Sequence, residues 1–77
     1  MTYGEYRVGI SFNPAANEHV NEIKRRAADL IDYIHDWSMS NSGEGNFEAD
    51  RLAGRAIDTI DDAAMQAVKA ITKEPMT

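Results

Sequence analysis

The stretch VNEIKRRAADLIDYIHDW, residues 20–37, carries apolar residues at the spacing of one helix face. These residues are Val20, Ile23, Ala27, Leu30, Ile34 and Trp37. Alternating steps of three and four are typical of a helix that packs along a partner helix. We therefore predict a first helix over residues 14–38, with Asn13 as its N-cap and Pro14 at its first position, where a missing N–H costs nothing.

A second stripe predicts a second helix over residues 47–73. Its apolar positions are Ala53, Ile57, Ile60, Ala64, Ala67 and Ile71. Asn46 is the expected cap, and Pro75 follows the expected end. Residues 39–46, MSNSGEGN, have the composition of a loop that reverses the chain, and residues 74–77 form a frayed tail. The sequence thus predicts an all-α antiparallel two-helix hairpin in a single domain over residues 1–77.

Residues 1–13 are predicted to form a short extended arm. Tyr6, Val8, Ile10 and Phe12 alternate with other residues, and this two-residue period is typical of an extended segment. So short a segment cannot form a sheet alone, so we expect it to lie on another part of the protein, with Gly9 permitting a bend.

Size and charge narrow the possible functions. A chain of 77 residues buries only about 60% of its surface on folding, and its alanine-rich stripes bury little in one hairpin, so we expect a compact homo-oligomer. The absence of cysteine favours a reducing compartment. A net charge of −5 argues against binding along DNA or RNA polymers, and no signal peptide or membrane-length apolar run is present. We expect a cytoplasmic protein without membrane contact, whose anionic ligand, if any, is small.

Three consecutive cations, Lys24, Arg25 and Arg26, stand out in this acidic chain. Helical residues are about 100° apart, so Lys24 and Arg26 should flank the apolar stripe while Arg25 points into solvent. One interpretation is ion pairing, with Asp29 in the same helix or with acids of the second helix. Those acids are Asp50, Asp58, Asp61 and Asp62. The other interpretation is that Lys24 and Arg26 hold phosphates at a subunit boundary.

Other chemistry has weaker signals. Asp58, Asp61 and Asp62 have a spacing that can hold Mg²⁺ in all-helical nucleotide hydrolases, but an acidic amphipathic helix produces the same spacing. There is no glycine-rich phosphate loop and no cysteine nucleophile. We expect no enzyme activity, no metal and no other cofactor. The aromatic residues Tyr6 and Phe12 either stack on a planar base or clasp a neighbouring subunit.

Three stretches together carry a family resemblance. They are RVGISFNPAAN (7–17), VNEIKRRAADLID (20–32) and DDAAMQAVKAITK (61–73). Over about residues 6–73 the chain resembles the phage-encoded hairpin family of anti-CBASS cyclic-nucleotide sponges. The resemblance implies a helical hairpin that assembles into a hexamer and sequesters cyclic di- and trinucleotide messengers, such as cGAMP or cyclic tri-adenylate, without cleaving them. The CBASS effector in the bacterial host cytoplasm is then not activated.

The resemblance also implies site residues. Tyr6, or alternatively Phe12, would stack on a base, Lys24 or Arg26 would contact phosphate, and Arg7 and Asn13 would assist. A second pocket for trinucleotides would use Ala28, Lys69, Thr72 and Lys73. Gln66 stands where many relatives carry a large aromatic residue, which leaves the preferred messenger open. The alternative to the sponge is a helical oligomeric protein-interaction module without a nucleotide ligand.

Overall fold

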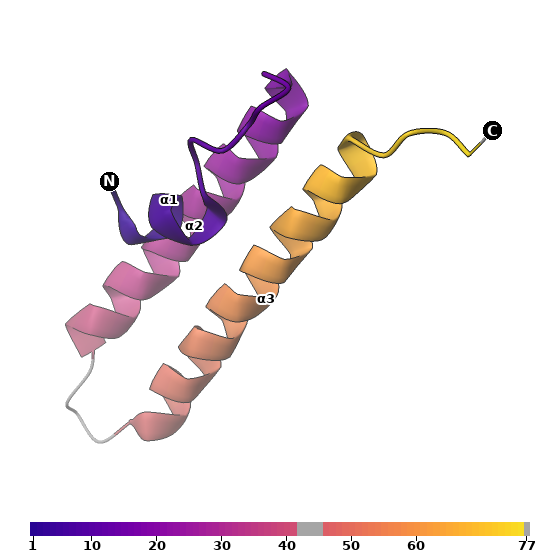
Figure 1. Cartoon of the computed structure of the whole chain (residues 1–77). Helices are drawn as coiled ribbons and strands as arrows, with labels where there is room; N and C mark the ends of the chain where they lie inside the picture. The colour runs from indigo at the N-terminus through magenta and orange to yellow at the C-terminus, as the bar shows by residue number, and fades with distance from the viewer. Residues whose placement is uncertain (42–45, 77) are drawn as a thin grey trace.

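The structure is a computed structural model that describes residues 1–41 and 46–76. Within these ranges it contains three helices and no strand: α1 (Tyr3–Val8), α2 (Glu18–Asn41) and α3 (Phe47–Ile71). The long helices α2 and α3 run antiparallel side by side, and α1 lies across the middle of α2 (Figure 1). The molecule measures 54 × 25 × 12 Å, so the hairpin is a single layer of helices. The prediction of an all-α hairpin is confirmed.

The prediction of an extended arm is wrong, because residues 3–8 form helix α1. Thr2 and Glu5 form a capping box, in which the Thr2 hydroxyl accepts from the Glu5 N–H and the Glu5 carboxylate accepts from the Thr2 N–H. Gly9 ends the helix in the left-handed conformation at φ 63°, and the Ile10 N–H returns to the Glu5 carbonyl. These local start and stop signals outweigh the two-residue apolar period that suggested a strand.

Helix α2 begins four residues later than predicted. The Asn17 side chain, rather than that of Asn13, accepts hydrogen bonds from the His19 and Val20 N–H groups. Asn13 instead donates its amide to the Asn17 carbonyl and to the Asn21 side chain, which closes a turn. Ala16 has a φ of 50°, so a helix cannot run through it.

The predicted loop over residues 39–46 lies partly outside the described residues, whereas the second long helix is described in full. Helix α2 continues to Asn41, beyond the predicted end at residue 38, and residues 42–45 of the predicted loop lie outside the described residues. Asn46 caps α3 by accepting from the Ala49 N–H, as expected. Helix α3 ends at Ile71, two residues before the predicted end.

Helix α1 docks on α2 through a close backbone approach. Gly4 lies directly over the carbonyl of Ala28, and its N–H donates to the Asp32 carboxylate at 2.6 Å. The Tyr3 ring stacks on His35 with centroids 4.4 Å apart. Only a residue without a Cβ permits this contact, since a Cβ on Gly4 would overlap the Ala28 carbonyl.

The core forms where the three helices meet. It consists of Val8, Ala28, Ile31 and Ile57, with four partly buried neighbours. Those neighbours are Ile10, Ala27, Ile34 and Ile60.

The predicted stripe is buried in α3 but only partly in α2. Ala53, Ile57 and Ala64 of α3 are buried, whereas Leu30 and Trp37 of α2 remain 50% and 48% exposed. The buried face of α2 is rotated because α2 packs against α1 as well as α3. Two of its six stripe residues, Leu30 and Trp37, therefore face outward. No helix in the described ranges has both the length and the hydrophobicity needed to cross a membrane.

Candidate functional site

The three consecutive cations have three different environments. Arg25 donates to Glu5 of α1 at 2.7 Å and to Asp29 at 2.8 Å, so the expectation that it is simply solvated is wrong. The ion pair with Asp29 is confirmed. Arg26 is exposed and pairs with Glu22 at 3.2 Å, not with Asp29.

The Glu5–Arg25 pair couples α1 to α2 electrostatically. The hydrogen bond from Arg25, together with that from the Thr2 N–H, lowers the pKa of Glu5 from 4.5 to about 2. Its carboxylate also raises the pKa of Arg25, so both groups stay charged at neutral pH.

Lys24 is the buried member of the three, at 3% exposure. Its ammonium donates to the Gly9 carbonyl at 2.9 Å and to the Phe12 carbonyl, and it lies 5.5 Å from the centre of the Phe12 ring. The charge is thus directed at the segment that follows α1. In this chain it is not presented to solvent.

A cavity of about 350 Å³ lies beside Lys24, between this segment, the start of α2 and the end of α3. Its lining is Phe12, Asn13, Pro14, Ala15, Val20, Lys24, Met65, Val68 and Thr72. Four predicted site residues therefore meet in one place: Phe12, Asn13, Lys24 and Thr72. The Phe12 ring is 73% exposed, so one of its faces is free for a planar group.

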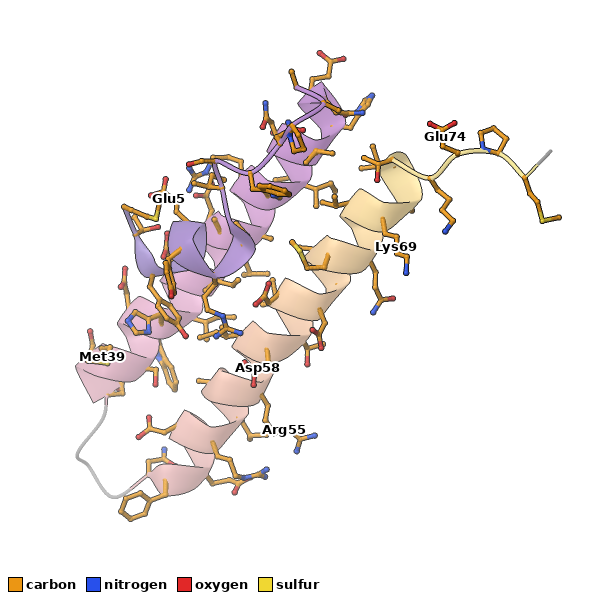
Figure 2. The ribbon with its side chains drawn as sticks, in the orientation of Figure 1. Glu5, Met39, Arg55, Asp58, Lys69 and Glu74 are labelled. Atoms are coloured by element: carbon orange, nitrogen blue, oxygen red, sulfur yellow. The ribbon has the colours of Figure 1, made fainter. Side chains whose placement is uncertain are left out.

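Lys69 and Lys73 line a separate shallow hollow with Gln66 and Ala70. Lys69 is three residues before Thr72 and four after Met65, so the three side chains are neighbours on the surface of α3. Figure 2 shows Lys69 projecting from the C-terminal part of this helix. Lys69 does not line the cavity itself, so its positive charge lies on a neighbouring face of α3.

The structure places Tyr6, Arg7 and Ala28 away from the cavity. Tyr6 is exposed on α1, and Ala28 is fully buried under that helix. The Arg7 guanidinium donates to Asp58 at 2.8 Å and to Asp61 at 3.2 Å, and these bonds raise its pKa.

The acidic residues of α3 are thus engaged by an arginine. Arg7, through Asp58 and Asp61, ties α1 to α3; Figure 2 labels Asp58 on α3. Across residues 1–41 and 46–76, no three His, Asp or Glu side chains gather in a way that could hold a metal ion.

Five residues that line the cavity were not predicted as site residues, namely Pro14, Ala15, Val20, Met65 and Val68. Met65 and Val68 line the cavity although they flank the apolar stripe of α3, and Gly4 sets the position of α1. The capping signals at Thr2, Glu5 and Gly9 could have revealed α1. The lining role of Met65 and Val68 has no local signal, because it depends on where residues 9–15 lie.

The comparisons with known proteins agree with this architecture. A family model described as Acb2/Tad1, hairpin domain, matches residues 5–72, which include all three helices apart from the first two residues of α1. The chain matches no curated protein and no solved structure. On the strength of the family match, the chain belongs to the Acb2/Tad1 hairpin family of anti-CBASS cyclic-nucleotide sponges.

Proposed function

We propose that this protein binds cyclic di- and trinucleotide messengers, such as cGAMP or cyclic tri-adenylate, and sequesters them without cleavage. CBASS effectors in the cytoplasm of an infected bacterial host would then receive no signal. The observation that carries the proposal is the cavity beside Phe12, where an exposed ring, apolar walls and Lys24 lie together. A cyclic oligonucleotide offers matching groups, namely planar bases and phosphates.

Phe12 is the better placed of the two predicted stacking residues. It lines the cavity with Pro14 and Met65, so a base on its ring would also contact apolar side chains. Tyr6 is exposed on α1 and lines none of the hollows described here. Stacking of one base contributes about 1–3 kcal/mol to binding.

The phosphates would be contacted by exposed cations rather than by buried ones. Lys69, near the end of α3, and Lys73, just beyond it, line one hollow. Arg26 is exposed on α2 and would reach a ligand held between subunits. Charge-assisted hydrogen bonds of this kind contribute about 1.5–3 kcal/mol each.

Capture without turnover fits the chemistry of the lining. In the described part of the chain, the cavity wall contains neither a carboxylate nor a histidine that could act as a general base. Asp58 and Asp61, the candidates for a Mg²⁺-dependent hydrolase, bind Arg7 instead.

Self-association, into a hexamer as the resemblance implies, is also part of the proposal. Four large apolar side chains on α2 and α3 are about half exposed or more: Leu30, Tyr33, Trp37 and Leu52. Leu30 and Trp37 belong to the predicted apolar stripe, and in the described part of the chain no further helix covers them. A second copy of the chain would bury this surface.

Titration calorimetry with a panel of cyclic di- and trinucleotides tests the proposal, followed by heating of the complex and chromatography of the released ligand. We expect sub-micromolar binding and recovery of intact ligand. Phe12→Ala should weaken binding, whereas Phe47→Ala, which removes a still more exposed ring at the N-terminal end of α3, should not. Absence of heat across the panel, or recovery of a linear product, would refute the proposal.

A protein-interaction module remains the second candidate. It is favoured by an apolar hollow of about 460 Å³ between α2 and α3, whose lining includes Tyr33, Trp37 and Leu52. Under this alternative, Trp37→Glu would abolish association with a protein partner, and no cyclic nucleotide would bind.

A further inference from the structure

Helix α1 is too short to be stable by itself. It has six residues, whereas isolated helices shorter than about 12–15 residues are marginal in water. Its capping box and the turn at Gly9 satisfy terminal backbone groups, but so short a helix forms few hydrogen bonds within itself. The helix therefore depends on its docking against α2 and α3, and it would unfold if it detached.

The apolar contribution to this docking is small. Of the residues in α1, Gly4 and Val8 are buried, and Val8 contributes the apolar side chain that joins the core. Tyr6 is exposed. In contrast, α2 and α3 bury apolar side chains from residue 20 to residue 31 and from residue 53 to residue 64. Apolar burial thus holds the hairpin together better than it holds α1.

Ion pairs hold α1 on both of its sides. Towards α2, Glu5 pairs with Arg25. Towards α3, Arg7 pairs with Asp58 and Asp61. All five side chains are partly exposed, so dissolved salt weakens these pairs.

We propose that α1 is a strap latched by these ion pairs, which detaches and unfolds as one unit while α2 and α3 stay packed. Screening or removal of the pairs favours the detached state. In that state Ala28 and Ile31 of α2 lose the cover of Gly4 and Val8, so an apolar surface opens on the hairpin. The inference goes beyond the proposed function, because it concerns a second conformation of the chain and needs no nucleotide.

Trypsin detects the detached state directly, because Arg7 is itself a cleavage site. The protease needs an extended backbone and an accessible arginine, and docked α1 offers neither. When opening is fast relative to cleavage, the cleavage rate follows the population of the open form.

The other arginines provide the internal reference. Arg26 lies within α2 and Arg55 within α3, where Figure 2 labels it, so cleavage at these sites requires the hairpin to open. We expect initial cleavage after Arg7 to be at least roughly 10-fold faster than after Arg26 or Arg55, because the strap opens locally. Equal initial rates at the three sites would overturn the proposal.

A destabilised hairpin separates local detachment from unfolding of the whole molecule. Ala53→Gly weakens α3 at a buried position more than one helical turn before Asp58, so it should speed cleavage after Arg55 several-fold. Cleavage after Arg7 should keep its rate, because the strap opens without the hairpin. A parallel rise at both sites would show that α1 opens only when the whole molecule unfolds, which would refute the strap.

A matched pair of variants tests the latch itself. Asp61→Asn removes a partner of Arg7, whereas Asp62→Asn removes the same charge from the next residue, which is exposed and is not among the ion-pair partners of Arg7 in the described part of the chain. From the strength of a hydrogen bond to a charged group, Asp61→Asn should speed cleavage after Arg7 roughly 10-fold, and Asp62→Asn should change it less than about 2-fold. Equal effects of the two substitutions would contradict a latch made by this pair.

Salt tests the latch without any substitution. Raising sodium chloride from about 0.1 M to about 1 M shortens the screening length from about 10 Å to about 3 Å. Cleavage after Arg7, normalised to a small synthetic trypsin substrate in the same buffer, should rise several-fold, and it should rise less in Asp61→Asn. A normalised rate that does not respond to salt would show that charge does not hold the strap.

Discussion

Substitution of Gly4 by alanine provides a sharp test of how α1 is held. A Cβ at this position would overlap the Ala28 carbonyl and would lie 2.8 Å from the Asp32 carboxylate. The overlap is with backbone, which cannot move aside as a flexible side chain can. Helix α1 would therefore have to lift away from α2.

The expected change in the free energy of unfolding combines one favourable and two unfavourable contributions. Alanine in place of glycine in a helix favours folding by about 1 kcal/mol. Loss of the hydrogen bond from the Gly4 N–H to the Asp32 carboxylate costs about 1.5–3 kcal/mol, and overpacking costs about 1–3 kcal/mol. The net loss is about 1.5–5 kcal/mol, which for a domain of this size lowers the midpoint of thermal unfolding by at least about 6 °C.

Gly54→Ala is the matched control. Gly54 is exposed inside α3, and no atom lies within 4 Å of a Cβ built there, so this variant should gain up to about 1 kcal/mol. Thermal and urea unfolding of both variants, followed by circular dichroism at one protein concentration, measures the difference. If Gly4→Ala is as stable as Gly54→Ala, the close packing of α1 on α2 is wrong.

Three further predictions concern the core and the ion pairs that hold α1. Ile31→Ala, at a fully buried position, should lower the free energy of unfolding by about 2–5 kcal/mol in urea denaturation, and a loss below about 1 kcal/mol would contradict its place in the core. Because the pKa of Glu5 is lowered in the folded protein, its stabilising contribution is present above pH 4.5 and is lost as the pH falls towards about 2. Glu5→Gln should flatten this part of the curve of unfolding free energy against pH. An unchanged curve would argue against the pair with Arg25. Arg7→Met should cost about 1–2 kcal/mol in the same denaturation assay, since it leaves the carboxylates of α3 without their cation, and a neutral effect would show that the α1–α3 pairs are screened by water.

The sequence predicts the long helices better than the segment before them. Helical periodicity and the Asn46 cap are local signals, and both are reproduced in α3. The alternation of four apolar residues predicts an extended arm over residues 1–13, but the capping box at Thr2 and Glu5 starts helix α1 there.

Parts of the site depend on tertiary structure and could not be predicted from helical spacing. The spacing places Lys24 beside the apolar stripe, but its burial follows from residues 9–12, which fold over it. Likewise, the pairing of Asp58 with a cation was expected, but the partner is Arg7 of α1 rather than a cation of α2. Both differences arise because α1 packs on the hairpin.

The burial of Lys24 affects how this protein can be labelled. The chain has three lysines and no cysteine, so reagents that attach dyes or crosslinkers usually react with its amines. The shielded Lys24 would be spared, and the reagent would attach to the N-terminus, Lys69 and Lys73. An amine-labelled sample would thus lose positive charge in the hollow lined by Lys69 and Lys73, so binding is better followed on unlabelled protein or through the intrinsic fluorescence of its single tryptophan, Trp37.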